Sequence, residues 1–158
     1  MLSDGRLHIC RQSTQASKLG LTTAIRYALT RRQFGPPGGP EVPLMNYRMH
    51  QRRLIPLLAT TYCHHFAVED LYATFGIFGQ RPADRASQRA NHILSSGMKS
   101  LCSWHMINTL QMCREACGGQ GFKSSNLIGI MKSDMDVHAT YEGDNWVLLQ
   151  TVSASFSL

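Results

Sequence analysis

The sequence contains no run of about 18 apolar residues, the shortest stretch from which we would expect a membrane-spanning helix. It also contains no internal repeat and no low-complexity tract, which argues against repeat arrays and disordered chains. Its 158 residues are 43% hydrophobic and 16% charged, a balance typical of globular proteins. We therefore expect one soluble domain with its own hydrophobic core.

Cysteines are few, and their number is odd. No secretory leader precedes them, so the sequence predicts a reducing compartment rather than a disulfide framework. Cys113 and Cys117 lie four residues apart near His105, but no Cys-x-x-Cys pair or second ligand pair completes a zinc site. We predict buried thiols and no metal. The five cysteines are Cys10, Cys63, Cys102, Cys113 and Cys117.

Acidic residues are outnumbered, because 16 Lys and Arg face 10 Asp and Glu and give a formal net charge of +6. A basic chain favours anionic partners such as nucleic acid, a phosphorylated cofactor or an acidic subunit. The basic residues are scattered, without a helix-turn-helix or interleaved aromatic residues, so we predict no nucleic-acid partner. The ends carry no readable address, since Phe156, Ser157 and Leu158 do not match the Ser-Lys-Leu peroxisomal signal.

Apolar residues recur at intervals of three and four, the period of an amphipathic helix. The pattern predicts long helices over about residues 5–32, 46–78 and 84–117, and a fourth that begins near Glu142. Pro56 predicts a kink or a late start in the second helix. Proline and glycine clusters separate these segments, in "FGPPGGPEVP", "GIFGQRPADR" and "GGQGF".

No strand pattern is strong enough to predict a sheet. The predicted fold is therefore all-α, an up-and-down antiparallel four-helix bundle. We expect one domain over residues 1–150 and a frayed, disordered tail over residues 151–158.

Two short motifs offer groups that could bind a phosphorylated ligand. In "TRRQFG", Arg31 could bind phosphate oxygens and Phe34 could stack on a ring, beside Gln33, although cations also suit a helix C-terminus. In "ACGGQGF", Gly118 and Gly119 allow a ligand to approach the backbone closely. A helix C-cap explains these glycines equally well, and no preceding strand supports a Rossmann site.

Glutamate is scarce enough for each one to be weighed singly. Glu142 stands in "TYEGDN" at a loop-to-helix junction, where the outward-pointing amides of the next helix favour an acidic cap. The alternative is a general base, which requires a carboxylate aimed at a substrate atom in a dry pocket. The four glutamates are Glu41, Glu69, Glu115 and Glu142.

The motifs together carry more information than each does alone. In order, "SKLGLTTAIRYALTRRQFGPPG", "HQRRLIPLLATTY", "CREACGGQGF" and "TYEGDN" resemble the acyl-CoA oxidases, flavoproteins of peroxisomal fatty-acid β-oxidation related to the acyl-CoA dehydrogenases. The resemblance covers residues 5–150 and implies a helical domain that binds FAD and fatty acyl-CoA. It also implies the reaction, oxidation of acyl-CoA to trans-2-enoyl-CoA with formation of hydrogen peroxide, and a peroxisomal location.

The resemblance also implies roles for individual residues. Glu142 would remove the α-proton of the thioester while the β-hydride passes to flavin N5, and Tyr141 and Gly143 would contact the substrate. Arg31, Gln33 and Phe34 would contact the FAD of the partner subunit in a homodimer. Gly118 and Gly119 would face the pyrophosphate of the flavin. Asp144 and Asn145 would cap the next helix and line the cavity.

The family has an amino-terminal helical domain and a β-domain before this region, and a further helical domain after it. This chain does not contain them. A second hypothesis follows, in which the chain is a non-catalytic, truncated helical bundle that acts only by association with a full-length subunit.

Overall fold

The computed structural model describes residues 2–75 and 84–156, which are helical over most of their length. The strands in the described part of the chain are two, each of two residues, and they pair as an antiparallel hairpin. The prediction of an all-α fold is therefore confirmed. The α-helices are α1 (Leu2–Thr30), α2 (Arg48–Phe75), α3 (Arg85–Ala116), α4 (Ile128–Met135) and α5 (Asn145–Phe156), and the strands are β1 (Arg32–Gln33) and β2 (Val42–Pro43).

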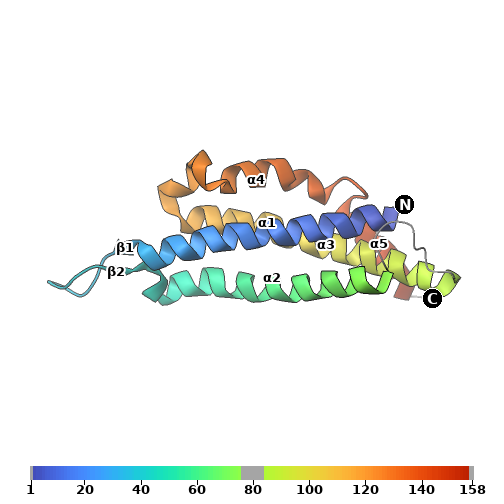
Figure 1. Ribbon diagram of the computed structural model, residues 1–158, viewed down its shortest axis with the longest axis horizontal. Helices are drawn as coiled ribbons and strands as arrows, with labels where there is room; N and C mark the ends of the chain where they lie inside the picture. Colours follow the sequence, from blue (N-terminus) through green and yellow to red (C-terminus); the bar gives the residue numbers. More distant parts are fainter. Residues whose placement is uncertain (1, 76–83, 157–158) are drawn as a thin grey trace.

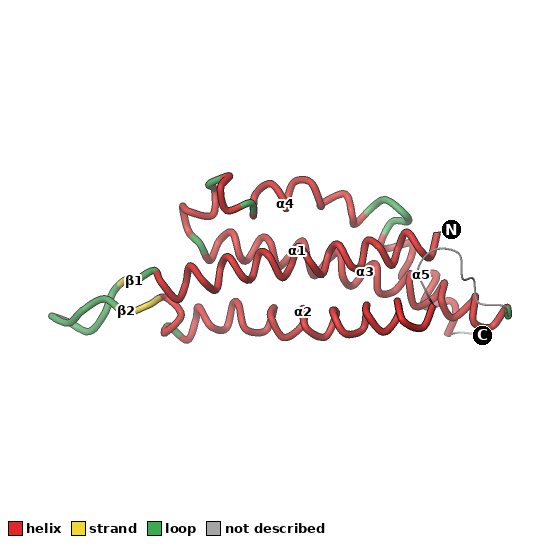
Figure 2. The backbone as a smooth tube through the Cα atoms, viewed as in Figure 1, coloured by secondary structure: helices red, strands yellow, loops and turns green. Residues whose placement is uncertain are grey.

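Three long helices lie side by side, with α2 running opposite to α1 and α3 (Figure 1). The short α4 lies on the other side of α1 and α3 from α2, and α5 packs against α3 near the start of α1. The hairpin of β1 and β2 projects beyond the far end of the helices (Figure 2). An up-and-down bundle of four helices is not confirmed, because two short helices follow the three long ones.

The helix α4 was not predicted from the sequence. It has only eight residues, includes Gly129 and directly follows a left-handed residue, Leu127, with a φ of 63°. Ile128 is nevertheless completely buried and belongs to the main core cluster. The local sequence pattern does not reveal α4, and the burial of Ile128 in the core is the tertiary contact that supports this helix.

The predicted boundaries of the long helices are close to the observed ones. Pro56 lies inside α2, which begins eight residues earlier at Arg48, so the late start is wrong. Asp84 caps α3, because its side chain accepts a hydrogen bond of 2.8 Å from the amide of Ser87. The predicted break in "GIFGQRPADR" and the predicted end of the second helix at residue 78 lie outside the described residues.

The helix α5 continues to Phe156, so residues 151–156 are helical rather than a frayed tail. Residues 157 and 158 lie outside the described part. None of the described helices is long and apolar enough to cross a membrane.

Small side chains let α1 and α3 pack closely. A β-carbon at Gly20 would lie 2.8 Å from Cδ2 of Leu110, so a larger residue here would force the Leu110 side chain to shift. Several buried serine hydroxyls donate to carbonyls of their own helix, as Ser17 and Ser103 illustrate. The main core cluster consists of Ala16, Leu21, Ala24, Leu54, Met106, Leu110, Cys113, Ala116, Cys117 and Ile128.

Candidate functional site

Glu142 lies in the turn before α5, with its carboxyl group against the start of α1. A β-carbon at Gly5 would lie 2.8 Å from both the carboxyl carbon and Oε1 of Glu142. Glu142 is half-buried, and its Oε2 is buried without a hydrogen-bond partner. Buried carboxylate oxygens normally accept hydrogen bonds. Because Oε2 of Glu142 accepts none from the protein, this atom is free to accept a proton.

The backbone of Glu142 is held in an unusual conformation by α1. Its φ is 56°, in the left-handed region that residues other than glycine seldom adopt. The buried Arg6 donates from Nε to the carbonyl of Glu142 at 3.0 Å. The same guanidinium donates from Nη1 to Oγ of Ser96 at 3.0 Å and to Nδ1 of His92 at 3.2 Å. Burial lowers the pKa of Arg6, and the charge of Glu142 opposes this shift.

A second cation, Lys99, holds the next residues from α3. Lys99 is completely buried, and its Nζ donates to the carbonyl of Gly143 at 2.6 Å and to Oδ1 of Asn145 at 2.9 Å. Burial lowers the pKa of Lys99, and the carboxylate of Asp144 acts in the opposite direction. Asn145 in turn donates from Nδ2 to Oγ of Ser103 at 2.9 Å.

The other residues of "TYEGDN" have separate tasks. Asp144 caps α5, because its Oδ1 accepts from the amides of Trp146 at 3.0 Å and Val147 at 3.3 Å. Gly143 has a φ of 113°, and a β-carbon there would lie 2.9 Å from Cδ2 of Leu148. The carboxylate of Asp144, rather than that of Glu142, therefore caps the helix.

Tyr141 lies at the rim of this turn. It is 41% exposed, and its ring lies 5.5 Å from that of His138. Burial raises the pKa of Tyr141, and the neighbouring Glu142 adds to the effect. A half-exposed phenol next to Glu142 in the sequence could contact a bound ligand.

The motif "TRRQFG" forms the other end of α1 and the first strand of the hairpin. Arg31 follows the last residue of α1 and donates from Nη2 to Oε1 of Gln33 at 3.1 Å. The Tyr47 hydroxyl donates to the carbonyl of Gln33 at 2.9 Å, and its ring meets Phe34 edge to face at 6.4 Å. Phe34 is 71% exposed. The segment thus presents both an exposed aromatic ring and an exposed guanidinium.

The motif "ACGGQGF" lies at the same end of the bundle as Arg31. Arg31, Cys117, Gln120 and Lys123 contribute to the lining of one groove of about 270 Å³. Gly118, with a φ of 56°, and Gly119 have no atoms within 4 Å of a β-carbon position, so the space beside both is open. Two cations and an unobstructed backbone suit a polyphosphate group.

The structure therefore places the predicted residues in two groups. Tyr141, Glu142 and Gly143 lie near the start of α1, whereas Arg31 and its neighbours lie beyond the end of α1 (Figure 1). Residues 5 and 30 of α1 are separated by about 38 Å at about 1.5 Å per residue. A single helix thus joins two candidate sites without merging them.

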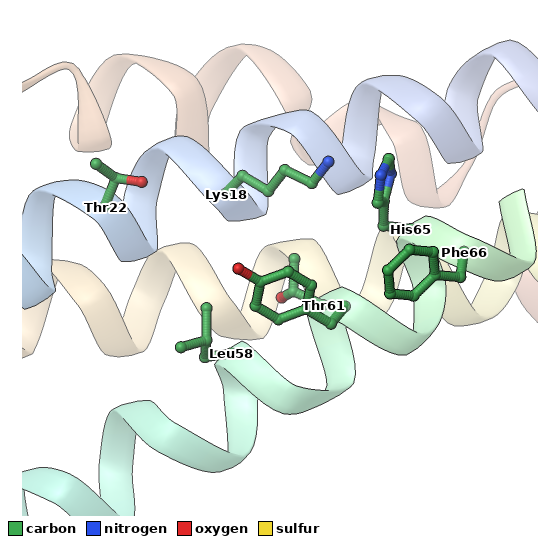
Figure 3. A pocket seen from close by; sticks show the side chains of 7 residues that line it. Lys18, Thr22, Leu58, Thr61, His65 and Phe66 are labelled. Atoms are coloured by element: carbon green, nitrogen blue, oxygen red, sulfur yellow. The ribbon is translucent and has the colours of Figure 1, made fainter. Parts of the chain in front are cut away.

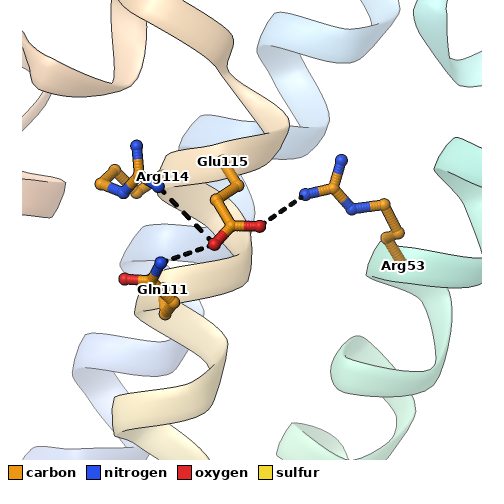
Figure 4. A network of polar contacts seen from close by, with 4 residues as sticks. All are labelled: Arg53, Gln111, Arg114 and Glu115. Carbon is orange, nitrogen blue, oxygen red and sulfur yellow. Dashed lines mark hydrogen bonds and ion pairs between the residues drawn. The ribbon is translucent and has the colours of Figure 1, made fainter.

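Glu115, another of the four glutamates, makes surface contacts (Figure 4). Its carboxylate accepts from Nη2 of Arg53 at 3.3 Å and from Nε2 of Gln111 at 2.5 Å, and Arg114 lies 3.6 Å away. The side chain of Glu115 is 41% exposed. Exposed ion pairs of this kind contribute little to stability, so Glu115 has a surface role.

A further hollow lies between α1 and α2 (Figure 3). None of the predicted site residues lines it. Its walls are Lys18, Thr22, Leu58, Thr61, Tyr62, His65 and Phe66.

The cysteines are free thiols, and Cys113 and Cys117 are buried as the sequence predicts. Burial raises the pKa of Cys113 to about 12. Within residues 2–75 and 84–156, no group of three or more Cys, His, Asp or Glu side chains is arranged to hold a metal ion.

A family model described as "Acyl-CoA oxidase, C-alpha1 domain" matches residues 1–156. A putative peroxisomal acyl-coenzyme A oxidase 3.2 of Arabidopsis thaliana is 49% identical over 153 residues, which are 96% of this chain and 22% of that protein. The human peroxisomal acyl-coenzyme A oxidase 3 is 39% identical over 159 residues, with 96% of this chain and 23% of the relative covered.

Solved structures give the same result. Acyl-CoA oxidase 3 of Yarrowia lipolytica matches with a TM-score of 0.81 at 35% identity, over 98% of this chain and 24% of that one. Acyl-CoA oxidase-1 of Caenorhabditis elegans, solved with FAD and ATP, matches with a TM-score of 0.90 at 25% identity. The match covers 98% of this chain and 24% of that one. The chain spans about a quarter of the length of these relatives.

Proposed function

The chain belongs to the acyl-CoA oxidase family, and we propose that it supplies the catalytic base and part of the FAD site of such an oxidase. The reaction is the oxidation of fatty acyl-CoA to trans-2-enoyl-CoA with formation of hydrogen peroxide. Because relatives from a plant and from humans carry the word peroxisomal in their names, we place this activity in the peroxisome.

The buried Oε2 of Glu142, which has no hydrogen-bond partner, is the observation that carries the proposal. A carboxylate oxygen already satisfied by amides would have to give up a bond before it could take a proton. Glu142 has the opposite arrangement, since its backbone carbonyl is bonded to Arg6 while Oε2 remains unbonded. It would remove the α-proton of the thioester, with Tyr141 and Gly143 beside the substrate.

The residues at the other end of α1 fit the anionic part of FAD. Arg31 and Lys123 offer two cations in one groove, and the backbone at Gly118 and Gly119, next to the groove residue Cys117 in the sequence, is open to a pyrophosphate. Phe34 offers an exposed ring for stacking. Bound FAD would supply the hydride acceptor for the β-hydrogen of the substrate.

The distance between the two groups favours a homodimer. Glu142 lies at the start of α1, whereas Arg31, Gln33 and Phe34 lie beyond its end, on and beside a hairpin that projects from the bundle. Side chains that project in this way can reach a second subunit. We propose that the hairpin contacts the FAD of a partner copy while Glu142 serves the flavin of its own subunit.

A non-catalytic role remains the second candidate, because the chain spans 22% of the length of the Arabidopsis relative. Many large apolar side chains are exposed, among them Met49 at 70% and Trp146 at 69%. Such surfaces suit association with further domains or a full-length subunit. Yellow flavin that remains with the purified chain would favour the enzyme, and its absence together with binding to a full-length relative would favour association alone.

The proton-transfer role is tested in a chimera in which this chain replaces the matching segment of the Yarrowia lipolytica oxidase. Glu142→Gln keeps the size of the side chain and removes the basic oxygen. We expect flavin bleaching by acyl-CoA, measured without oxygen, to slow by about 10⁴-fold or more. Glu115→Gln is the matched control and should bleach at the parent rate. Parent-rate bleaching by Glu142→Gln would refute the assignment.

A further inference from the structure

Lys99 is the largest completely buried side chain of the described residues, and the proposed reaction does not use it. Its ammonium group donates to two neutral oxygens, the carbonyl of Gly143 and the amide oxygen of Asn145. Burial of an ammonium group is unfavourable unless hydrogen bonds and nearby charges compensate it. A lysine at this position therefore has a specific structural purpose.

The acceptors of Lys99 belong to Gly143 and Asn145, in and next to a turn with two consecutive positive φ angles. Glu142 has a φ of 56° and Gly143 a φ of 113°. A left-handed residue other than glycine persists only where its surroundings fix it. The short 2.6 Å hydrogen bond from Lys99 fixes the carbonyl of Gly143, the residue that directly follows the strained Glu142.

A second layer fixes the position of Asn145. Its Nδ2 donates to Oγ of Ser103, and its backbone carbonyl accepts from Oγ of Ser100 at 3.2 Å. Lys99, Ser100 and Ser103 all lie on one face of α3, so this helix holds the turn from one side. Arg6 of α1 holds the carbonyl of Glu142 from the other side.

We propose that Lys99 is a positioning residue, whose bonds to Gly143 and Asn145 hold the turn so that the carboxylate of Glu142 stays against Gly5. The inference rests on the proposed function for the catalytic meaning of that placement. The mechanical part of the proposal is the structural claim that Lys99 fixes residues 142–145, and this claim does not depend on the proposed function.

The mechanical part is tested on the 158-residue chain by amide hydrogen exchange. Lys99→Met keeps a long, unbranched side chain, one bond shorter than lysine, and removes all its donors. We expect exchange in residues 141–147 to become at least about tenfold faster, while amides at the centres of α1 and α2 keep their protection. Lys132→Met is the matched control and should leave residues 141–147 unchanged. Unchanged exchange at residues 141–147, or equal acceleration throughout the chain, would overturn the proposal.

If Lys99→Met does not fold, Lys99→Gln replaces it. Glutamine keeps a polar end in the buried site but is one bond too short to reach the carbonyl of Gly143 in place. The same local acceleration is expected. Parent exchange in Lys99→Gln at residues 141–147 would overturn the proposal.

The catalytic part is tested by a double-mutant cycle in the chimera. Lys99→Met should slow flavin bleaching per bound flavin by about tenfold or more with little change in acyl-CoA affinity. In the Glu142→Gln background, Lys99→Met should cause no further loss of rate. A residue that acts only by positioning the carboxylate of Glu142 has no effect once that carboxylate is absent. Additive losses would indicate general destabilisation and overturn the inference.

The outcomes separate the two proposals. Parent-rate bleaching by Glu142→Gln refutes the base while the exchange result for Lys99 still stands. Slow bleaching by Glu142→Gln together with parent-rate bleaching by Lys99→Met refutes only the positioning role.

Discussion

Gly5 and Glu142, at opposite ends of the chain, are in direct contact, and the contact requires the absence of a side chain at residue 5. A β-carbon there would lie 2.8 Å from the carboxyl carbon of Glu142. The first turn of α1 is therefore shaped around the group that we propose as the base.

This contact predicts the effect of one added methyl group. Gly5→Ala should displace the carboxylate of Glu142 and slow flavin bleaching in the chimera by about 10²-fold, the cost of a misplacement of about 1 Å. Gly129→Ala is the control, because no atom lies within 4 Å of a β-carbon at that helical position. Equal rates for Gly5→Ala and the parent would show that the carboxylate position is not critical.

The groove at the other end of α1 makes a prediction about cofactor affinity. Arg31→Lys keeps the charge but loses the planar guanidinium that can bind two phosphate oxygens. We expect FAD to bind about tenfold more weakly to the chimera, measured by flavin fluorescence on dilution. Arg26→Lys, at an exposed position of α1 five residues earlier, should bind FAD as the parent does. Unchanged affinity in Arg31→Lys would remove Arg31 from the cofactor site.

The thiols should differ in reactivity according to exposure. Cys63 is exposed, whereas the other four cysteines are buried. A hydrogen bond with Cys10 lowers the pKa of Cys102 to about 6, but Cys102 is only 1% exposed. We therefore expect a thiol-alkylating reagent to modify one residue in the native chain and all five in denaturant, counted by mass spectrometry. Rapid modification of native Cys63→Ser would contradict the buried positions.

Stability should decrease between neutral and acidic pH, in part because of His105. Burial lowers the pKa of His105 to about 4 from the ordinary 6.5. Between these values the unfolded chain binds a proton that the folded chain does not, so stability falls as pH decreases through this window. His105→Gln should reduce the slope of unfolding free energy against pH, by at most about 1.4 kcal/mol per pH unit. Urea unfolding measures it, with Asn108→Gln as the control, and equal slopes in parent and His105→Gln would contradict the shift.

The periodicity of apolar residues was sufficient to predict the long helices, because each buries one continuous face. It was insufficient for α4, where eight residues with a glycine carry little local signal and burial of Ile128 comes from distant parts of the chain. The position of residues 151–156 in α5 was missed for a similar reason, since serine-rich ends resemble frayed tails.

The predicted site residues came from motifs, whereas Arg6 and Lys99 escaped notice because no local pattern links them to Glu142. A signal was nevertheless present on α3. Ser95, Ser96, Lys99, Ser100 and Ser103 recur at helical spacing and form one buried polar face. Sequence alone reads such a face as exposed to solvent, because burial of a lysine is rare unless an internal partner is known.

The hairpin that projects beyond the helices has a consequence for how the protein responds to dilution. In the proposed homodimer, a subunit that lends Arg31, Gln33 and Phe34 to its neighbour would obey mass action, so its flavin affinity would depend on its own concentration. Two inactive copies, one altered at Glu142 and the other at Arg31, would then restore one intact centre when mixed, as complementing halves of a single catalyst.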